Sequence, residues 1–115
     1  MPFININTTK KLSDEAKNAL QTAIVENISV FPGKTKEFTT INIIDGCAMY
    51  KNGQSLNGAF IEVRIFRNTT EQAKKEFANH LFDVTSRILE TQPSDVHINY
   101  LELQEWGVGG VYKKA

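Results

Sequence analysis

The chain has 115 residues, of which 41% are hydrophobic and 23% charged, a size and composition typical of one globular domain. Lysine plus arginine and aspartate plus glutamate number 13 each, so the net charge is zero and argues against a basic nucleic-acid-binding face. One cysteine and two scattered histidines exclude an internal disulfide and give no metal-ligand pattern. We therefore expect a single domain over residues 1–115 with no nucleic-acid partner, no bound metal and no cofactor.

The amino-terminal segment has no basic stretch followed by an apolar one, as a secretion signal would have. No apolar run comes near the roughly 20 residues that span a bilayer. The sequence therefore predicts a cytoplasmic protein without a membrane partner.

The first half of the chain predicts a strand, a helix and a second strand. Residues 3–6 alternate between apolar and polar side chains, as a half-buried strand does. Ser13 has the features of a helix cap, and Pro32-Gly33 ends the helix. Residues 38–44 are rich in β-branched side chains and predict the second strand. The helix has one apolar stripe, interrupted by Asn27 and made of Ala16, Leu20, Ala23, Ile24, Ile28 and Phe31.

The second half repeats this plan after a loop over residues 46–58, in which Asn52-Gly53 indicates a tight turn. Residues 60–66 predict a strand, Thr69 or Thr70 caps a helix, and residues 96–103 predict another strand. The apolar face of this second helix consists of Ala73, Phe77, Leu81, Val84 and Ile88.

The two halves superpose without a gap when shifted by 57 residues, which places Phe3-Ile4 on Phe60-Ile61. We interpret residues 2–45 and 59–102 as pseudo-repeats, each a β-α-β unit whose two parallel strands are joined by a right-handed crossover. The predicted fold class is α+β, a four-stranded mixed sheet with two helices on one face and a short C-terminal strand. The other face of such a sheet is bare, and packing against further subunits is the simplest way to bury it.

Four short stretches resemble one family of proteins. PFININTTKKLSDEAK at residues 2–17 and EWGVGG at residues 105–110 are similar to the start and to the Phe-Gly-Ile-Gly-Gly turn of 4-oxalocrotonate tautomerase. PGKTKEFTTINI at residues 32–43 and DVHINY at residues 95–100 resemble the substrate-lysine segment and the last core strand of macrophage migration inhibitory factor. Through these stretches the chain resembles the tautomerase superfamily over nearly its whole length.

This resemblance implies a fused, double-length subunit that assembles as a homotrimer around a barrel of sheets. It also implies a cofactor-independent tautomerase, an isomerase acting on a small carboxylate or 2-oxo acid, in which removal of Met1 leaves Pro2 as the catalytic base. By the same resemblance Lys34 falls on a substrate-binding lysine, Asn99 on a matched strand residue and Trp106 on the active-site aromatic residue.

The chain also departs from the family pattern. Leu12 stands where the short tautomerases have arginine, and His97 where relatives have a functional tyrosine or arginine. One branch of the family hydrates or dehalogenates haloacrylates, or decarboxylates malonate semialdehyde, and has arginines where the third strand meets the second helix. Arg67 matches one of these arginines and Thr69 replaces the other, so the departures concern the substrate more than the fold.

Pro2 admits two interpretations from the residues alone. A proline behind Met1 is a common and harmless second residue. A free amino-terminal proline, however, is a rigid secondary amine. Burial, or a nearby lysine or arginine, would lower its pKa. An amine that is neutral near pH 7 can remove a proton from a carbon next to a carbonyl.

The candidate substrate-binding cations are Lys34 and Arg67. Lys34 follows the predicted helix end, where a solvated lysine is equally reasonable. As a point charge it would hold a carboxylate or polarise a carbonyl. Arg67 lies at the end of a predicted strand, whereas Arg64 lies inside it and needs an ionic partner such as Glu62 or Glu102. Which arginine faces the site stays open at this point.

His97 and Asn99 share one face of the last core strand. In one interpretation both residues pack and form hydrogen bonds between strands. In the other they touch substrate, and His97 donates a hydrogen bond to the developing enolate oxygen. Trp106 is either an interface anchor or an apolar wall that desolvates the base. Gly109-Gly110 predicts a tight turn that leads to a short last strand at residues 111–112.

Two other functions stay open. A hydratase, dehalogenase or decarboxylase of the same superfamily would use protonated Pro2 as an acid and a carboxylate such as Glu37 or Glu105 to orient water. A non-catalytic trimeric binding or signalling protein would keep Pro2 without using it.

Overall fold

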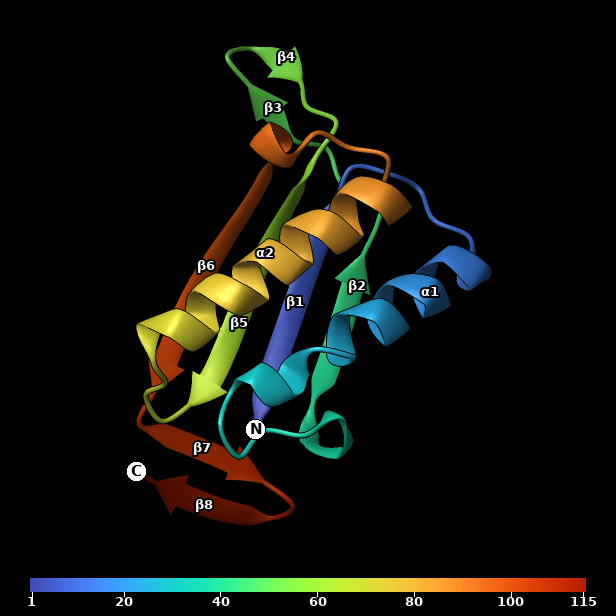
Figure 1. Ribbon diagram of the computed structural model, residues 1–115. Helices are drawn as coiled ribbons and strands as arrows, with labels where there is room; N and C mark the ends of the chain where they lie inside the picture. Colours follow the sequence, from blue (N-terminus) through green and yellow to red (C-terminus); the bar gives the residue numbers. More distant parts are fainter.

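The computed structural model describes residues 1–115 as a four-stranded sheet with two helices packed on one side (Figure 1). The sheet consists of β1 (Pro2–Thr8), β2 (Thr40–Ile44), β5 (Ala59–Phe66) and β6 (Val96–Leu103), in the order β2-β1-β5-β6. β1 and β2 are parallel, as are β5 and β6, whereas β1 and β5 are antiparallel. Two β-α-β units therefore meet at the centre of a mixed sheet, and the predicted fold class is confirmed.

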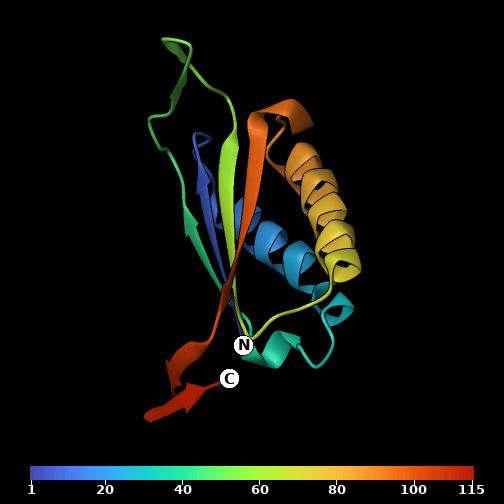
Figure 2. The same cartoon turned by 90° about the vertical axis from the view of Figure 1, so that its left-hand side faces the viewer.

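Helices α1 (Asp14–Val25) and α2 (Glu71–Ile88) cover the same face of this sheet, as the edge-on view in Figure 2 shows. Each begins at a hydroxyl side chain that accepts a hydrogen bond from a backbone N–H three residues later, at 3.1 Å. The accepting atoms are Ser13 Oγ and Thr70 Oγ1, so Thr70 rather than Thr69 is the cap of α2. Neither helix has the length and apolar character needed to cross a bilayer.

The first helix is shorter than its apolar stripe predicts. α1 ends at Val25, and Asn27 has left the helical conformation, with φ −107° and ψ 10°. A 3₁₀ turn, η1 (Ile28–Val30), follows and carries Ile28 and Phe31 into the core, where they are 2% and 0% exposed. The stripe therefore stays buried although its backbone is not one continuous helix.

The core lies between the sheet and the two helices. Its buried apolar side chains come from alternate positions of the strands and from one face of each helix. Phe31 and Phe77 are the largest of them, with ring centroids 4.9 Å apart. His80 joins the two helices, because its Nε2 donates to the carbonyl oxygen of Ala23 at 2.6 Å.

The opposite face of the sheet has no covering helix (Figure 2). One row of this open face, in register across all four strands, is entirely polar and consists of Asn42, Asn5, Glu62 and Asn99. Asn42 Nδ2 donates to Asn5 Oδ1 at 2.7 Å, and Arg64 pairs with Glu62 at 3.5 Å. Arg64 therefore has its ionic partner on the open face.

Two segments between the units differ in detail from the prediction. β2 begins at Thr40 rather than residue 38, because a 3₁₀ turn, η2 (Lys36–Phe38), precedes it and leaves Phe38 66% exposed. The predicted turn at residues 52–53 is confirmed. It joins β3 (Tyr50–Lys51) to β4 (Gln54–Ser55), and both turn residues have positive φ, as tight hairpins of this kind require. A third 3₁₀ turn, η3 (Pro93–Asp95), lies at the predicted break before β6.

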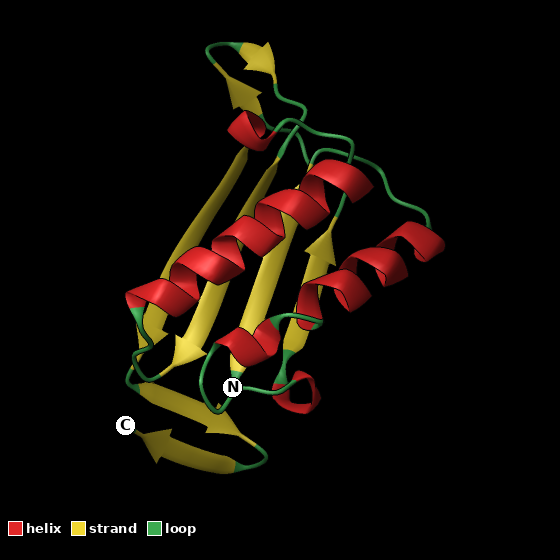
Figure 3. Ribbon diagram, viewed as in Figure 1, coloured by secondary structure: helices red, strands yellow, loops and turns green.

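The C-terminal segment is more extensive than the predicted turn and short strand. β7 (Glu105–Val108) and β8 (Val111–Lys114) form a hairpin beyond the end of the sheet where the amino terminus lies (Figures 1 and 3). Gly109 and Gly110 form its turn with φ of 61° and 78°, values that glycine adopts without strain. The register places Trp106 directly opposite Lys113, so both side chains lie on one face of the hairpin.

Candidate active site

The start of β1 lies at the end of the sheet where β5 and β6 finish. Pro2 is paired with Ile65, and Ile65 with Glu102. Pro2 is buried at this place. Two cavities, of about 640 and 420 Å³, adjoin here, and Met1 lines both of them. Removal of Met1 would therefore leave the amine of Pro2 between the two cavities.

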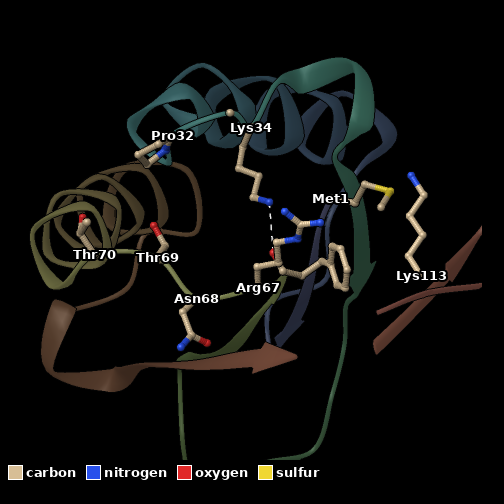
Figure 4. Close-up of a pocket in the computed structure, with 10 residues that line it drawn as sticks. Met1, Pro32, Lys34, Arg67, Asn68, Thr69, Thr70 and Lys113 are labelled. Carbon is tan, nitrogen blue, oxygen red and sulfur yellow. Dashed lines mark hydrogen bonds between the residues drawn. The ribbon is translucent and has the colours of Figure 1, made fainter. Parts of the chain in front are cut away.

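The larger cavity is cationic. Lys34, Arg67 and Lys113 line it together with amino-terminal Met1, and no acidic residue does (Figure 4). Its other lining residues are Pro32, Gly33, Phe66, Asn68, Thr69 and Thr70. The charges come from the loop after η1, the end of β5 and strand β8, so distant parts of the chain direct positive charge to the start of β1. This arrangement suits an anionic ligand.

Whereas Arg64 pairs with Glu62 on the open face of the sheet, Arg67 lines this cavity. Its backbone is left-handed, with φ 72°, a conformation that is uncommon for residues other than glycine. Its N–H donates to the carbonyl oxygen of Leu103 at 2.7 Å, and its guanidinium carbon lies 5.2 Å from the centre of the Phe66 ring. The Arg67 backbone is therefore held by a hydrogen bond, and its guanidinium lies against the Phe66 ring.

Lys34 reaches the same end of β5 from the first half of the chain. Its Nζ donates to the carbonyl oxygen of Phe66 at 3.2 Å, the contact drawn in Figure 4. The preceding residue, Gly33, turns the chain with φ 76°. Lys34 and Arg67 thus contact the same residue and hold two cations close to each other.

Glu102, near the end of β6, is paired with a lysine that does not line the cavity. Glu102 accepts hydrogen bonds from Lys74 Nζ at 2.7 Å and from the N–H of Thr69 at 2.6 Å. The bond from Lys74, then that from Thr69, holds the pKa of the Glu102 carboxyl below its usual range. Because Glu102 is engaged with Lys74, the cations of the cavity keep no carboxylate partner of their own.

The amino group itself has a weakened affinity for protons. Burial, then the adjacent Lys34 ammonium and the charge of Lys113, lower the pKa of the Met1 amine from 8.0 to about 6. The Met1 amine is therefore largely neutral at pH 7. A neutral amine beside fixed cations can act as a base toward an anionic ligand.

The smaller cavity is mainly apolar. Pro2 shares it with Phe38, Trp106 and Val108, and Glu37 is its one acidic residue. The Trp106 ring lies 6.5 Å from the Phe66 ring, which links the apolar cavity to the cationic one. Trp106 is thus near Pro2, as the apolar-wall interpretation requires.

His97 and Asn99 lie elsewhere in the single chain. Both are on the open face of β6, in register with Phe60 and Glu62, and the His97 ring stacks on the Phe60 ring at 5.8 Å. Glu102 is in register with Pro2 across β5, and His97 lies five positions before Glu102 on β6. His97 is therefore about 17 Å from the level of Pro2 along the strand. One copy of the chain does not bring these two residues to Pro2.

Phe66 and Lys113 line the larger cavity but were not among the predicted site residues. Phe66 carried a usable signal, because strand alternation places this large apolar side chain on the same face as Glu62 and Arg64, away from the helices. Lys113 carried none, since a lysine in a terminal Lys-Lys pair looks like a solvated residue.

Comparison with known proteins agrees with this architecture. A family model described as macrophage migration inhibitory factor (MIF) matches residues 1–112. Among solved structures, MIF2 of Leishmania major has a TM-score of 0.90 at 16% identity, with 97% of each chain covered. The R7 fused 4-OT, solved as an asymmetric trimer, has a TM-score of 0.84 at 16% identity, covering 95% of this chain and 94% of that one. Comparison with curated protein sequences finds no match.

A further solved relative is Pt0534 in a form inactivated by 2-oxo-3-pentynoate, with a TM-score of 0.78 at 20% identity over 94% of this chain and 92% of that one. The sheet, the paired helices and the terminal hairpin thus define a protein of the tautomerase-type β-α-β fold. The chain belongs to the macrophage migration inhibitory factor family.

Proposed function

We propose that this protein is a cofactor-independent tautomerase that interconverts the keto and enol forms of a 2-oxo acid, with Pro2 as general base after removal of Met1. The observation that carries the proposal is the position of the amino terminus between a cationic and an apolar cavity. The cations suit the carboxylate of such a substrate, and the apolar residues suit the rest of it.

The proposed reaction is a 1,3-proton transfer. The neutral amine of Pro2 takes a proton from the carbon next to the carbonyl. The electron pair of that C–H bond forms a carbon–carbon double bond, and the π pair of the carbonyl moves to its oxygen. Lys34 and Arg67 stabilise the negative charge that develops there and on the carboxylate. The protonated amine then returns its proton at the oxygen, or at the carbon in the reverse direction, so no atom is gained or lost.

Each residue of the site has a separate part in this proposal. Arg67 holds the carboxylate through its planar guanidinium, and its fixed backbone limits the freedom lost on binding. Lys34 polarises the carbonyl and keeps the amine neutral. Trp106 excludes water from Pro2, which strengthens the electrostatic interactions there.

We further propose that the working assembly is a homotrimer. The open face of the sheet exposes apolar side chains such as Phe60 and Leu101, each 39% exposed, and a polar row between them. Packing such faces together would bury them. A second copy would then be the means of bringing His97 and Asn99 to the site of the first, where His97 would donate to the enolate oxygen.

A hydratase-type reaction is a second candidate because of Glu37. This carboxylate lines the apolar cavity together with Pro2, whereas Glu105 does not line it. In that reaction protonated Pro2 would act as an acid and Glu37 would orient water. Activity on acetylenic acids or haloacrylates that is lost in Glu37→Gln would favour this function over tautomerisation.

The test of the proposed function begins with intact-mass measurement of protein from cells. The proposal requires the loss of Met1. A retained Met1 would make the Pro2 nitrogen an amide without basicity and would contradict the proposal. Turnover of phenylpyruvate enol by the wild type and by Pro2→Ala then follows. We expect a loss of about 10²- to 10⁴-fold in Pro2→Ala, the usual contribution of a positioned base. Absence of turnover in the wild type would leave the binding or signalling protein as the better account.

A further inference from the structure

We infer that Glu102 is a positioning residue: it holds the loop that carries Arg67, and through that loop it sets how tightly the carboxylate of the substrate is bound. The inference rests on the proposed function and adds to it a residue that does not line the cavity. We call residues 67–69, which join β5 to the cap of α2, the arginine loop.

Three consecutive residues of the arginine loop are bonded to three consecutive residues at the end of β6. The pairs, at 2.7, 3.0 and 2.6 Å, are Arg67 with Leu103, Asn68 with Gln104 and Thr69 with Glu102. The loop donates a backbone N–H in the first and third bonds and accepts a side-chain N–H in the second. It is therefore attached along its whole length to the strand that continues into the terminal hairpin.

Glu102 makes the one charged contact among these three. Its carboxylate accepts from the Thr69 N–H and, at 2.7 Å, from Lys74 Nζ on α2. A hydrogen bond to an ionised carboxylate is about twice as strong as one between neutral groups. The bond from Lys74, then that from Thr69, holds the pKa of the Glu102 carboxyl below its usual range, so the carboxylate is ionised at neutral pH. The Thr69 bond is therefore the strongest of the three.

The backbone conformation of Arg67 needs such support. Its φ of 72° costs free energy in a residue other than glycine, and such a conformation persists where the surrounding contacts hold it. Figure 4 shows the Arg67 side chain turned toward Lys34 and that of Asn68 turned away from it, so the loop backbone decides which side chain lies beside Lys34. Release of the Thr69 N–H would let this loop relax and the guanidinium move.

A purely electrostatic role for Glu102 predicts the opposite result from a positioning role. Removal of a negative charge near a cationic cavity would strengthen the binding of an anion. Loss of the acceptor for the Thr69 N–H would weaken it, because Arg67 would no longer be held in place. Glu102→Gln and Glu102→Ala remove the same charge, but only glutamine keeps a side-chain oxygen that can accept from Thr69. The two variants therefore distinguish the two roles.

The kinetic test uses phenylpyruvate enol. Glu102→Ala is expected to raise KM about tenfold with little change in kcat, and Glu102→Gln should keep KM within about threefold of the wild type. Asp83→Ala is the matched control, because Asp83 also pairs with a cation, Arg87 at 3.1 Å, but lies exposed near the other end of α2. It should leave KM unchanged. A KM that falls or does not change in Glu102→Ala would overturn the inference.

A second arm tests whether Glu102 acts through Arg67. In an Arg67→Gln background, Glu102→Ala is expected to change KM less than about twofold, because the guanidinium that the loop positions is already absent. An equally large rise in KM in both backgrounds would mean that Glu102 acts by another route, and would also overturn the inference.

Amide hydrogen exchange measured by NMR reports the hold on the arginine loop without any substrate. The N–H groups of Arg67 and Thr69 should exchange about tenfold or more faster in Glu102→Ala, and close to the wild-type rate in Glu102→Gln. The N–H of Leu20, a buried residue of α1, should keep its rate in both, because a loss of global stability would accelerate it as well. Unchanged exchange at Arg67 would overturn the inference even in an active enzyme.

Failure of the inference is therefore distinguishable from failure of the proposed function. Absence of turnover by the wild type would count against the proposed function alone. The Kd of phenylpyruvate, measured by calorimetry, would then replace KM in both arms with the same expected changes. A Kd that Glu102→Ala does not raise would overturn the inference, and absence of binding by the wild type would overturn both.

Discussion

The guanidinium of Arg67 lies over the ring of Phe66, its neighbour in sequence, at 5.2 Å from the ring centre, while the Arg67 backbone is left-handed with φ 72°. A side chain beyond glycine costs free energy in this conformation. We infer that the free-energy cost of an arginine in this conformation is tolerated because its side chain is needed in the cavity.

Arg67→Gly should therefore separate stability from activity. Glycine relieves the backbone and should leave the free energy of unfolding unchanged or raise it by up to about 1 kcal/mol. Loss of the carboxylate contact should lower kcat/KM for a 2-oxo acid about 10- to 100-fold, mainly through KM. Thermal unfolding and steady-state kinetics measure the two effects. Asn52→Gly is the control, because Asn52 also has positive φ but lies in the distant β3–β4 turn, so it should alter stability alone.

Lys34 sets the pH dependence of the proposed base. Burial, then the adjacent Lys34, lowers the pKa of the Met1 amine. We expect the same surroundings to lower the pKa of the Pro2 amine once Met1 is removed, and an amine acts as a base only above its pKa. Removal of the Lys34 charge should raise that pKa, so the acidic limb of the kcat/KM profile should move to higher pH in Lys34→Gln. A profile whose acidic limb does not move would contradict this role, even if the overall rate falls.

The open face of the sheet should control assembly. Phe60→Asp places a charge on an apolar part of that face, which is 39% exposed in the single chain, and should shift the protein from trimer toward monomer. Light scattering after size-exclusion chromatography measures the mass. Asn79→Asp, an exposed position on α2 that faces away from the sheet, is the control and should leave the mass unchanged. A monomeric wild type would refute the proposed trimer directly.

The free energy of unfolding should depend on the contact between the buried rings of Phe31 and Phe77. Phe77→Ala removes a fully buried ring that lies 4.9 Å from that of Phe31 and should cost about 3–5 kcal/mol of unfolding free energy. Phe38→Ala, at 66% exposure, should change it by less than about 0.5 kcal/mol. Urea unfolding distinguishes the two, and similar losses would mean that the core lies elsewhere.

The sequence predicts the sheet and helices well because their signals are local and repeated. Alternation along β1 and β5 and the hydroxyl caps of both helices each act within a few residues, and the internal repeat gives the same signals a second time 57 residues later. The early end of α1 was not predictable, because the apolar stripe continues through η1 although the backbone does not remain α-helical.

The candidate site is less predictable, because local signals do not show which distant residues the fold brings together. Pro2, Lys34, Arg67 and Trp106 were found through family resemblance, and the structure brings them to two adjoining cavities. Lys113 reaches the site only because the terminal hairpin folds back, a long-range event that no local pattern marks. His97 and Asn99 remain predictions, since their place in a site depends on a second copy.

The most direct test of the central claim is a titration of the proline nitrogen by NMR in protein labelled with ¹⁵N-proline. The chain has three prolines, and only Pro2 can carry a free amine after Met1 is removed. We predict one titrating nitrogen, with a pKa well below the ordinary value of about 8 for an amino terminus. A proline signal that does not titrate, or that titrates at or above that ordinary value, would contradict the proposal that Pro2 is the catalytic base.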